Sequence, residues 1–439
     1  MKINVYEWDL LTEAQKGALC RRVEGEIPPE VTASVQKILS SVRAEGDPAV
    51  IRYTRRFDEA DIGGLPMAVT EEEFDEARRK LAPEVQKAIR FAVENVRRAH
   101  EPQRVKGLEL VEVLPGVSVG ERWVPLDSVG LYVPRGRGSF PSVMYMQAVP
   151  AAIAGVKRVV SVSPPDRDGR VDPAVLFAAR LCGVHEVYRV GGVQALAALA
   201  FGTGSIPRVD KILGPGGIYV VAAKQALRDQ VDVGLPAGPS ESIVLADAGA
   251  DPKRAALDLI IEAEHGSDSS AYLVTPSREL ALSVQDRLPG LIEELPPRRA
   301  DFVRDVLTGF GGIVITADLE QALEFVNAYA PEHLQLACRE PLDLLPRIVH
   351  AGEILLGQNT PFSVANYAAG CNNVIPTGGW ARTCSPLSVR EFLKSSSVVY
   401  VTDAGLKSLR RPVAVLARYE GFAAHALAVE RRFEGPENP

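Results

Sequence analysis

Apolar residues recur at three- and four-residue intervals along the first part of the chain, with charged residues between them. This spacing places the apolar side chains on one face of a helix. It predicts helices over residues 31–57, 70–80 and 84–100, with a strand-rich stretch near residues 111–119. The pattern therefore predicts a mainly helical N-terminal region over residues 1–120.

Further along, short and nearly continuous apolar runs alternate with helical segments. The first set of runs lies at residues 156–162, 184–190 and 209–213. The second set lies at residues 242–246, 271–274, 312–316, 334–337 and 353–356. Such alternation is typical of a parallel sheet covered by helices on both faces. We expect two Rossmann-like α/β domains over residues 121–238 and 239–380, followed by a C-terminal tail over residues 381–439.

The chain of 439 residues is longer than one hydrophobic core normally supports, which agrees with more than one domain. Its net charge of -7 provides no general attraction to nucleic acid or to an anionic membrane. No apolar run approaches the roughly 20 residues of a membrane span, and the N-terminus lacks the apolar core of a signal peptide. We expect a cytoplasmic protein that binds neither nucleic acid nor membrane.

The five cysteines are scattered without the CxxC spacing of a disulfide framework or thiolate zinc site. None has a neighbouring histidine, so we expect small buried apolar residues rather than a nucleophile. Three of the six histidines also lack a partner pattern: His100 and His350 are expected at the surface, and His185 in a structural role.

Glu262 and His265 end a predicted helix that Asp251 can cap and Pro252 can begin. Residues three apart share one helical face, and a carboxylate with an imidazole can grip a divalent metal there. A solvated helix end is the alternative interpretation.

Two other histidines also lie near a glutamate. Glu332 and His333 are adjacent at the entrance of a predicted strand, where we expect loops to face the ligand crevice and to perform acid–base chemistry. Glu420 and His425 are five residues apart, so the local spacing does not require contact.

Glycine-rich turns at residues 191–192 and 214–217 each follow a predicted strand and precede a helix. Such turns let backbone N–H groups approach an anion at a helix N-terminus, although neither is the full GxGxxG fingerprint. Ser240 lies in a Pro/Gly turn over residues 235–241, where a structural turn and a substrate contact are both open.

Seven short motifs follow one another along the chain. They are Leu131-Tyr-Val-Pro134, Val190-Gly-Gly-Val-Gln-Ala195, Gly214-Pro-Gly216, Leu235-Pro-Ala-Gly-Pro-Ser-Glu241, Ala263-Glu-His-Gly266, Ala330-Pro-Glu-His-Leu334, and Glu420-Gly421 with His425. No single motif is specific, but the ordered set resembles the histidinol dehydrogenase family over nearly the whole chain. The resemblance implies an α/β fold with two Rossmann-like, aldehyde-dehydrogenase-like domains, and a homodimer whose C-terminal tail is swapped into the partner's active site.

The same resemblance implies a zinc-dependent dehydrogenase that oxidises L-histidinol through histidinal to L-histidine while reducing two NAD, as in histidine biosynthesis. Glu332 then resembles the residue that activates water, and His333 the general base. The remaining site positions are the zinc ligands Glu262, His265, Asn366 and His425, the substrate contacts Ser142, Ser240, Asn373 and Glu420, and the NAD contacts Tyr132, Gln194 and Gly217.

Several of these positions depart from the family's pattern. The family has a glutamine at position 262 and an aspartate at position 366, so an amide and a carboxylate have exchanged places and the ligand charge is unchanged. Asn373 stands where the family has a substrate-contacting histidine, and Gly217 where it has an asparagine. We therefore expect a retained zinc site with an altered ligand environment.

Arg135 and Arg137 precede Ser142 in one loop. They are surface charges or cofactor-phosphate contacts in one interpretation, and they recognise an acidic substrate group in another, because arginine binds oxyanions bidentately. Three functions remain open: histidinol oxidation, oxidation of another small alcohol such as a sulfonated diol by the same chemistry, and a non-catalytic binding protein on the same fold.

Overall fold

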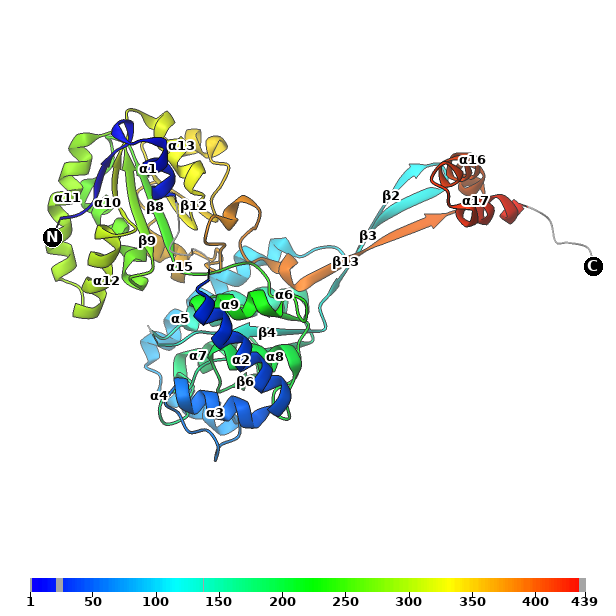
Figure 1. Ribbon diagram of the computed structural model, residues 1–439, viewed down its shortest axis with the longest axis horizontal. Coiled ribbons are helices and arrows are strands. Elements are labelled where there is room, and N and C mark those ends of the chain that lie inside the picture. The colour runs from blue at the N-terminus through cyan, green and yellow to red at the C-terminus, as the bar shows by residue number, and fades with distance from the viewer. Residues whose placement is uncertain (1, 21–26, 137, 434–439) are drawn as a thin grey trace, which may run out of the picture. The chain divides into compact units, whose positions relative to one another are not determined.

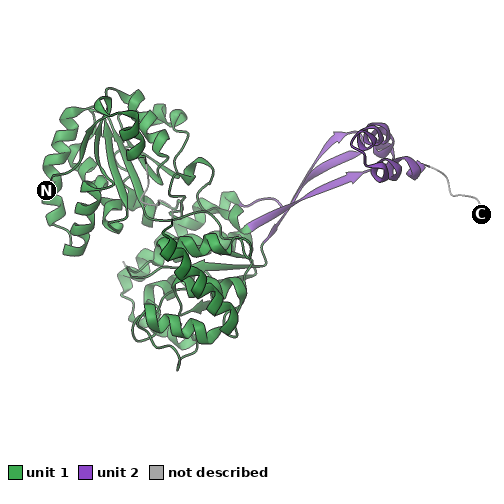
Figure 2. Ribbon diagram, in the orientation of Figure 1, with its two compact units in different colours: residues 1–103, 126–392 green, residues 104–125, 393–439 purple. Residues whose placement is uncertain are grey.

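The computed structural model describes residues 2–20, 27–136 and 138–433 in two compact units. The first unit comprises residues 1–103 and 126–392, and the second comprises residues 104–125 and 393–439 (Figure 2). The second unit is therefore assembled from two segments that lie far apart in the sequence. Residues 393–401 of the second segment pair with residues 117–125 of the first.

A four-stranded parallel sheet forms the centre of the first α/β layer (Figure 1). Its strands, in the order β6-β5-β4-β7, are β4 (Ser128–Tyr132), β5 (Arg158–Val162), β6 (Glu186–Tyr188) and β7 (Lys211–Leu213). The helices that alternate with them are α6 (Pro141–Ala154), α7 (Pro173–Leu181), α8 (Gly192–Phe201) and α9 (Ile218–Leu227). Strands β5, β6 and β7 confirm the predicted alternation of apolar strands and helices, whereas β4 was not among the predicted runs.

The helices of the N-terminal region pack against this layer. They are α2 (Pro29–Glu45), α3 (Asp47–Phe57), α4 (Glu71–Lys80) and α5 (Pro83–His100), preceded by α1 (Glu13–Leu19). Apolar residues of α2 and α3 share one core with α8, α9 and the sheet. Arg189, which is 1% exposed, pairs with Glu73 of α4 at 2.9 Å and so joins the helical region to the strand end of β6. The N-terminal helices thus complete the first α/β layer.

A six-stranded parallel sheet forms the second α/β layer. In the order β1-β10-β9-β8-β11-β12 its strands are β1 (Val5–Glu7), β8 (Glu241–Ala246), β9 (Ser270–Thr275), β10 (Gly312–Ile315), β11 (His333–Ala337) and β12 (Glu353–Leu356). Its helices are α10 (Pro252–Ile261), α11 (Arg278–Glu293), α12 (Pro297–Thr308), α13 (Leu319–Tyr329), α14 (Pro341–Leu344) and α15 (Phe362–Tyr367). The edge strand β1 was not predicted, because three residues are too few to show a period.

Alternate residues of the second sheet enter separate cores. Val244 and Leu273 pack with α10, α11 and α12, whereas Ile243 and Tyr272 pack with α13 on the opposite face. Successive side chains of a strand point to opposite faces, so a run of apolar residues buries both faces. This explains why these strands are continuously apolar in the sequence.

His100 is buried, and the prediction of a surface position is wrong. Its side chain is 2% exposed at the end of α5. Its Nδ1 donates to the Val96 carbonyl at 2.8 Å, and its Nε2 accepts from Asn372 Nδ2 at 3.3 Å. The polar partners that make burial possible come from 4 and 272 residues away, so local sequence around His100 does not reveal them.

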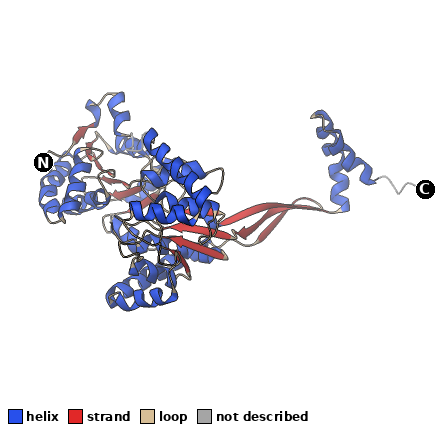
Figure 3. Cartoon of the chain, turned by 60° about the horizontal axis from the view of Figure 1, so that its bottom comes forward, coloured by secondary structure: helices blue, strands red, loops and turns tan. Residues whose placement is uncertain are grey.

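The second unit contains a three-stranded antiparallel sheet and two helices, which lie at one end of its strands (Figures 1 and 3). The strands, in the order β13-β3-β2, are β2 (Leu108–Leu114), β3 (Val117–Pro125) and β13 (Leu393–Val401); the helices are α16 (Asp403–Tyr419) and α17 (Ala423–Glu430). Gly116 connects β2 and β3 with a φ of +79°, and a Cβ there would lie 2.2 Å from Thr402 Oγ1. None of the described helices is long and apolar enough to cross a membrane.

Candidate active site

The first residues of three neighbouring strands form the centre of the site. β11 begins at His333 and lies between β8 and β12. His333 stands in register with Glu353, the first residue of β12, and with Ser242 of β8. Parallel strands that begin at the same level therefore bring a glutamate, a histidine and a serine to one edge of the sheet.

These residues lie at the amino ends of the strands, whereas Glu332 and His333 were expected from the sequence to face the ligand crevice. Loops at the entrance of β11 were expected to face the ligand crevice of a Rossmann-like sheet, but that crevice lies outside the carboxyl ends of the strands. The Glu332–His333 pair lies at the opposite end of the second sheet. The chain segment that enters β8 carries Gly238 and Ser240 to this edge, and Ala237 accepts a hydrogen bond from Gly216 of the first layer at 3.4 Å.

Glu332 is almost completely enclosed. It is 6% exposed, and its Oε2 accepts a hydrogen bond from the Glu241 backbone N–H at 2.9 Å. Burial raises the pKa of Glu332 well above its usual value, and the nearby Glu262 and Glu241 carboxylates add to this effect against the attraction of His333. The side chain is therefore a much stronger base than an exposed glutamate when it is ionised.

His333 lies among three carboxylates. Its Nδ1 is 2.8 Å from Glu353 Oε2, and its Nε2 is 3.9 Å from both Glu332 Oε2 and Glu262 Oε1. Burial lowers the pKa of His333, but the carboxylates of Glu262, Glu332 and Glu353 outweigh it and raise the pKa to about 10. Negative charge around the ring thus favours imidazolium in this cluster.

Glu262 and His265 come together in a different way from the predicted one. Asp251 caps α10 as expected, but the helix ends at Ile261, and Glu262–His265 form a 3₁₀ turn. Glu262 is fully buried, and its Oε2 lies 3.5 Å from His265 Nδ1. Ser240 Oγ lies 2.9 Å from the same His265 nitrogen. The turn thus brings a carboxylate, an imidazole and a hydroxyl together.

Asn366 completes this group from α15. Its Nδ2 donates to Glu262 Oε1 at 2.7 Å, and its side chain is buried. Burial raises the pKa of Glu262, but His265, His333, Asn366 and Ser240 together lower it below the usual value. Asn373 donates to the Asn366 backbone carbonyl at 2.8 Å, while its own Oδ1 is buried with no hydrogen-bond partner among the described residues.

The chemistry of this donor set fits a zinc ion. A carboxylate oxygen, an imidazole nitrogen and an amide oxygen are ligand types that zinc and other divalent cations accept. Glu262 Oε2 is buried without a hydrogen bond to any described residue, which leaves a charged oxygen for a ligand. Over residues 2–20, 27–136 and 138–433, no three His, Cys, Asp or Glu side chains form a metal-binding group by themselves; the amide of Asn366 is the third donor here.

The predicted cofactor residues lie at the carboxyl edge of the first sheet. Tyr132 ends β4, and its hydroxyl accepts from the Gly192 N–H at 3.2 Å. Gln194, in the first turn of α8, is fully buried, and both of its amide atoms lack partners among the described residues. Gly217 precedes α9, and a Cβ there would meet nothing within 4 Å. Two glycine turns and an unsatisfied amide thus lie at the end of the sheet at which dinucleotides bind in such folds.

The first residue of the glycine turn after β7 is restricted to glycine by its surroundings. Gly214 has a φ of +120°, and a Cβ there would lie 2.2 Å from the Tyr132 carbonyl oxygen. Lys224 of α9 is buried and donates to the Gly214 carbonyl at 2.6 Å, and burial lowers the pKa of this lysine to about 8. The close approach of β4 and β7 therefore requires glycine at this position.

Comparison with known proteins agrees with the motif set. The family model described as histidinol dehydrogenase matches residues 21–433. A histidinol dehydrogenase of Synechocystis is 50% identical over 422 residues, covering 96% of this chain and 97% of the relative. A histidinol dehydrogenase homolog 2 of Mesorhizobium japonicum is 48% identical and covers 97% of both chains. This chain belongs to the histidinol dehydrogenase family.

A solved structure of a family member has the same fold. The crystal structure of histidinol dehydrogenase from Elizabethkingia anophelis superimposes with a TM-score of 0.93 at 32% identity, and the match covers 98% of each chain. This α/β architecture with two parallel sheets is thus that of a histidinol dehydrogenase, and the expected fold class is confirmed.

Ser142 and Arg135 lie in or beside the first layer. Ser142 is 6% exposed in the first turn of α6. Arg135 follows β4, lies 3.9 Å from Asp166, and has a buried Nη1 without a hydrogen-bond partner among the described residues. Burial raises the pKa of Asp58 to about 6, although Arg135 lowers it in part. Arg137 lies outside the described residues, so the predicted arginine pair is represented by Arg135 alone.

Glu420 and His425 belong to the second unit. Glu420 is the C-cap residue directly after α16, and His425 lies in the first turn of α17, where its ring is 5.4 Å from that of Phe422. Both side chains are exposed. The remaining predicted ligands all lie in the first unit.

The cysteines are only partly as predicted. Cys182 and Cys338 are buried, whereas Cys20, Cys371 and Cys384 are half-buried. Burial and the adjacent Glu353 carboxylate together raise the pKa of Cys371 to about 12. A thiol in this state is a poor nucleophile.

Glu353 is the site residue that motif reasoning missed. No histidinol dehydrogenase motif in the sequence analysis includes it, yet it makes the shortest side-chain contact of His333. A signal was present in the sequence, because His333 directly precedes one predicted apolar strand and Glu353 begins another. Strand order was the missing information: the sequence does not show that these two strands are neighbours.

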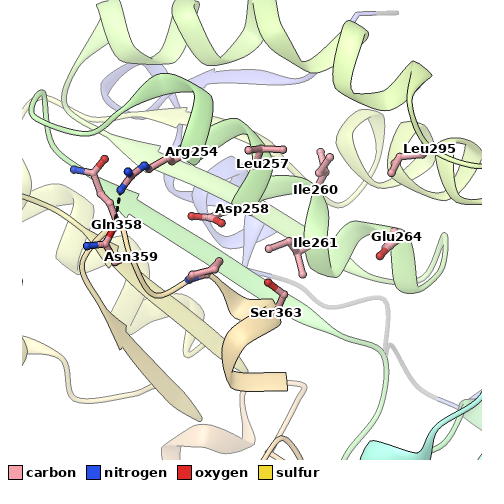
Figure 4. Close-up of a pocket in the computed structure, with 11 residues that line it drawn as sticks. Arg254, Leu257, Asp258, Ile260, Ile261, Glu264, Leu295, Gln358, Asn359 and Ser363 are labelled. Carbon is pink, nitrogen blue, oxygen red and sulfur yellow. Dashed lines mark hydrogen bonds between the residues drawn. The ribbon is translucent and has the colours of Figure 1, made fainter. Parts of the chain in front are cut away.

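A pocket of about 470 Å³ runs along α10 on the second layer (Figure 4). Polar residues Arg254, Gln358 and Asn359 lie at one end, and Arg254 donates to Asn359 at 2.8 Å. Burial raises the pKa of Asp258, which lines it, to about 6. None of the predicted site residues lines this pocket, so it is separate from the Glu332–His333 cluster.

Proposed function

We propose that this protein oxidises L-histidinol through histidinal to L-histidine, in the cytoplasm, with zinc in the site and NAD as the electron acceptor. The overall reaction consumes two NAD⁺ and one water and yields two NADH and three protons. Family membership supports the substrate. The observation that carries the chemistry is the buried cluster in which His333 Nε2 lies 3.9 Å from both Glu332 and Glu262.

Glu262, His265 and Asn366 would hold the zinc ion together with His425 of the partner subunit. When bound, zinc would polarise the substrate hydroxyl as a Lewis acid and would offset the carboxylate charge that keeps a proton on His333. One carboxylate and one amide give the same ligand charge as the amide and carboxylate of the family's pattern.

His333 would remove the hydroxyl proton in the first oxidation. Its Nδ1 is engaged by Glu353 at 2.8 Å, so Nε2 is the atom that accepts the proton. Nε2 also lies near Glu332, which can take up this proton and must release it to solvent before the second oxidation. In the second oxidation, Glu332 would accept a proton from the water that adds to the aldehyde, and its raised pKa makes it a suitable base.

Tyr132, Gln194 and Gly217 would bind NAD at the carboxyl edge of the first sheet. When bound, NAD supplies the hydride acceptor for both oxidations. The buried amide of Gln194 has no partner among the described residues, so a ligand that hydrogen-bonds it satisfies both polar atoms. Gln194→Ala should therefore weaken NAD binding in calorimetry about tenfold, with no change in zinc content. Unchanged NAD affinity would reject this assignment.

A homodimer with exchanged C-terminal segments would bring Glu420 and His425 to the partner's site. The second unit exposes large apolar side chains that a partner can cover: Val111 at 65%, Val399 at 64%, Tyr419 at 90% and Phe422 at 54%. A mixture of His333→Ala and His425→Ala chains tests the exchange. In a swapped dimer, one site of each mixed pair is intact, so mixing restores activity that neither variant has alone; no recovery would reject the exchange.

The substrate is tested with purified protein, zinc and NAD against histidinol and a panel of amino, hydroxy and sulfo alcohols. Two NADH per histidinol, with histidine as the product, is the expected result. Turnover of another alcohol without turnover of histidinol would overturn the substrate while preserving the dehydrogenase chemistry. No relative named here carries the name of a different alcohol.

A further inference from the structure

The strand register determines how Glu353 meets His333. These residues begin β12 and β11, stand directly opposite each other in the parallel ladder, and point to the same side of the sheet. The Glu353 N–H donates to the Glu332 carbonyl at 2.8 Å, and the Gly352 N–H donates to the Pro331 carbonyl at 2.9 Å. The main chain therefore holds the glutamate and the histidine together before any side-chain contact forms.

The carboxylate of Glu353 can only accept a hydrogen bond from the ring. Its Oε2 lies 2.8 Å from His333 Nδ1, and both side chains are buried, at 9% and 3% exposure. Because an ionised carboxylate has no donor, Nδ1 carries the proton in this contact. The neutral ring then has its lone pair on Nε2, which faces Glu332 and Glu262.

The remaining surroundings of the ring do not select this tautomer. Phe362 packs edge-on against His333, with ring centroids 5.6 Å apart, and this apolar contact limits rotation only. On the other side, Ser242 Oγ is buried and has no hydrogen-bond partner among the described residues. Among the described residues, Glu353 is thus the group whose contact with the ring fixes both its orientation and its protonated nitrogen.

We propose that Glu353 is a positioning residue, which holds His333 with Nδ1 protonated and directs the Nε2 lone pair toward the reacting hydroxyl. The proposal deepens the proposed function, on which its kinetic test rests. An amide at position 353 can both donate and accept, so Glu353→Gln would keep the volume but remove the preference for one tautomer.

Kinetics separate positioning from general structural support. Glu353→Gln should lower kcat by about 10- to 100-fold, as expected for loss of a residue that orients an imidazole, and should leave KM for histidinol and NAD nearly unchanged. In a His333→Ala background, the same substitution should have no further effect on kcat. Glu353→Asp, which retains a carboxylate, should recover part of the loss. The control is Glu320→Gln, an exposed glutamate of α13 that pairs with Arg347. It should leave kcat unchanged.

A spectroscopic measurement tests the contact without turnover. In protein with ¹⁵N-labelled histidine, His333 Nδ1–H should give a downfield, slowly exchanging proton signal that disappears in both His333→Ala and Glu353→Gln. An equal loss of kcat from Glu353→Gln with and without His333, or an Nδ1–H signal unaffected by Glu353→Gln, would overturn the proposal. If wild-type protein oxidises no histidinol, the substrate proposal fails, while the signal still decides the role of Glu353.

Discussion

Asn366 donates a hydrogen bond of 2.7 Å to Glu262, so two of the four positions that depart from the pattern of the resemblance are in direct contact. The amide and the carboxylate form one complementary pair, and exchanging them together keeps one donor, one acceptor and one negative charge. Glu262→Gln alone leaves two amides, whereas Asn366→Asp alone places two carboxylates together in a buried site. Each single substitution should lower zinc affinity about 10- to 100-fold.

The double substitution Glu262→Gln with Asn366→Asp should recover most of that affinity. Zinc retained after dialysis against a chelator, measured by mass spectrometry on all four proteins, tests the pairing. A double variant that retains no more zinc than the poorer single variant would contradict it.

The Arg189–Glu73 pair should contribute strongly to stability. Arg189 is 1% exposed and Glu73 14%, so removing one partner leaves a largely buried charge. Glu73→Gln should lower the free energy of unfolding by about 3 kcal/mol, a value typical of broken buried pairs. Urea unfolding measures the change. Glu45→Gln, which breaks the exposed pair with Arg52, is the matched control and should leave the transition unchanged.

Asp258 should make stability depend on pH. Burial raises its folded-state pKa from 3.8 to about 6, so between about pH 4 and pH 6 the folded protein retains a proton that the unfolded chain has released. Its contribution to stability therefore falls as pH rises through this window. Asp258→Asn should remove that fall and stabilise the protein at pH 7 by about 1 to 3 kcal/mol. Urea unfolding at pH 4.5 and pH 7 for both proteins is the measurement; a parallel pH response would count against it.

The oxidation should require no thiol. Burial and the neighbouring Glu353 carboxylate together raise the pKa of Cys371 to about 12, so the thiol stays protonated. Cys371→Ala and Cys384→Ala should each keep kcat within about threefold of wild type, whereas His333→Ala should lower it by about 100- to 10,000-fold. Steady-state assays decide this, and loss of activity in either alanine variant of a folded protein would revive a cysteine nucleophile.

Gly217 offers a test of the cofactor position. Its φ is −69°, which any residue adopts, and a Cβ there meets nothing within 4 Å. The resemblance places an NAD-contacting asparagine at this position, so Gly217→Asn should add one hydrogen bond and tighten NAD binding about fivefold, equivalent to about 1 kcal/mol. Gly217→Ala, which adds no polar group, should leave the affinity unchanged. Equal affinities of the asparagine and alanine variants in calorimetry would place the cofactor elsewhere.

Local patterns in the sequence determined much of the architecture. Continuous apolar runs revealed most strands of both sheets, because a strand covered on both faces must be apolar throughout, but β4 was not among the predicted runs. The Asp251 cap of α10 was also predictable from local sequence, because a capping side chain bonds to backbone within three residues of itself. Short elements such as β1 and the 3₁₀ turn at Glu262–His265 were missed, because three or four residues carry too little periodic signal.

The tertiary structure alone decided which reactive groups meet. His333 and Glu353 are 20 residues apart, and Glu262 and Asn366 are 104 apart, yet each pair is in hydrogen-bond contact. Motif order indicated the family and its chemistry, but strand order and register placed Glu353 against His333. Only the packed sheet also showed that the cluster lies at the amino edge, because side-chain proximity and burial depend on contacts between distant segments.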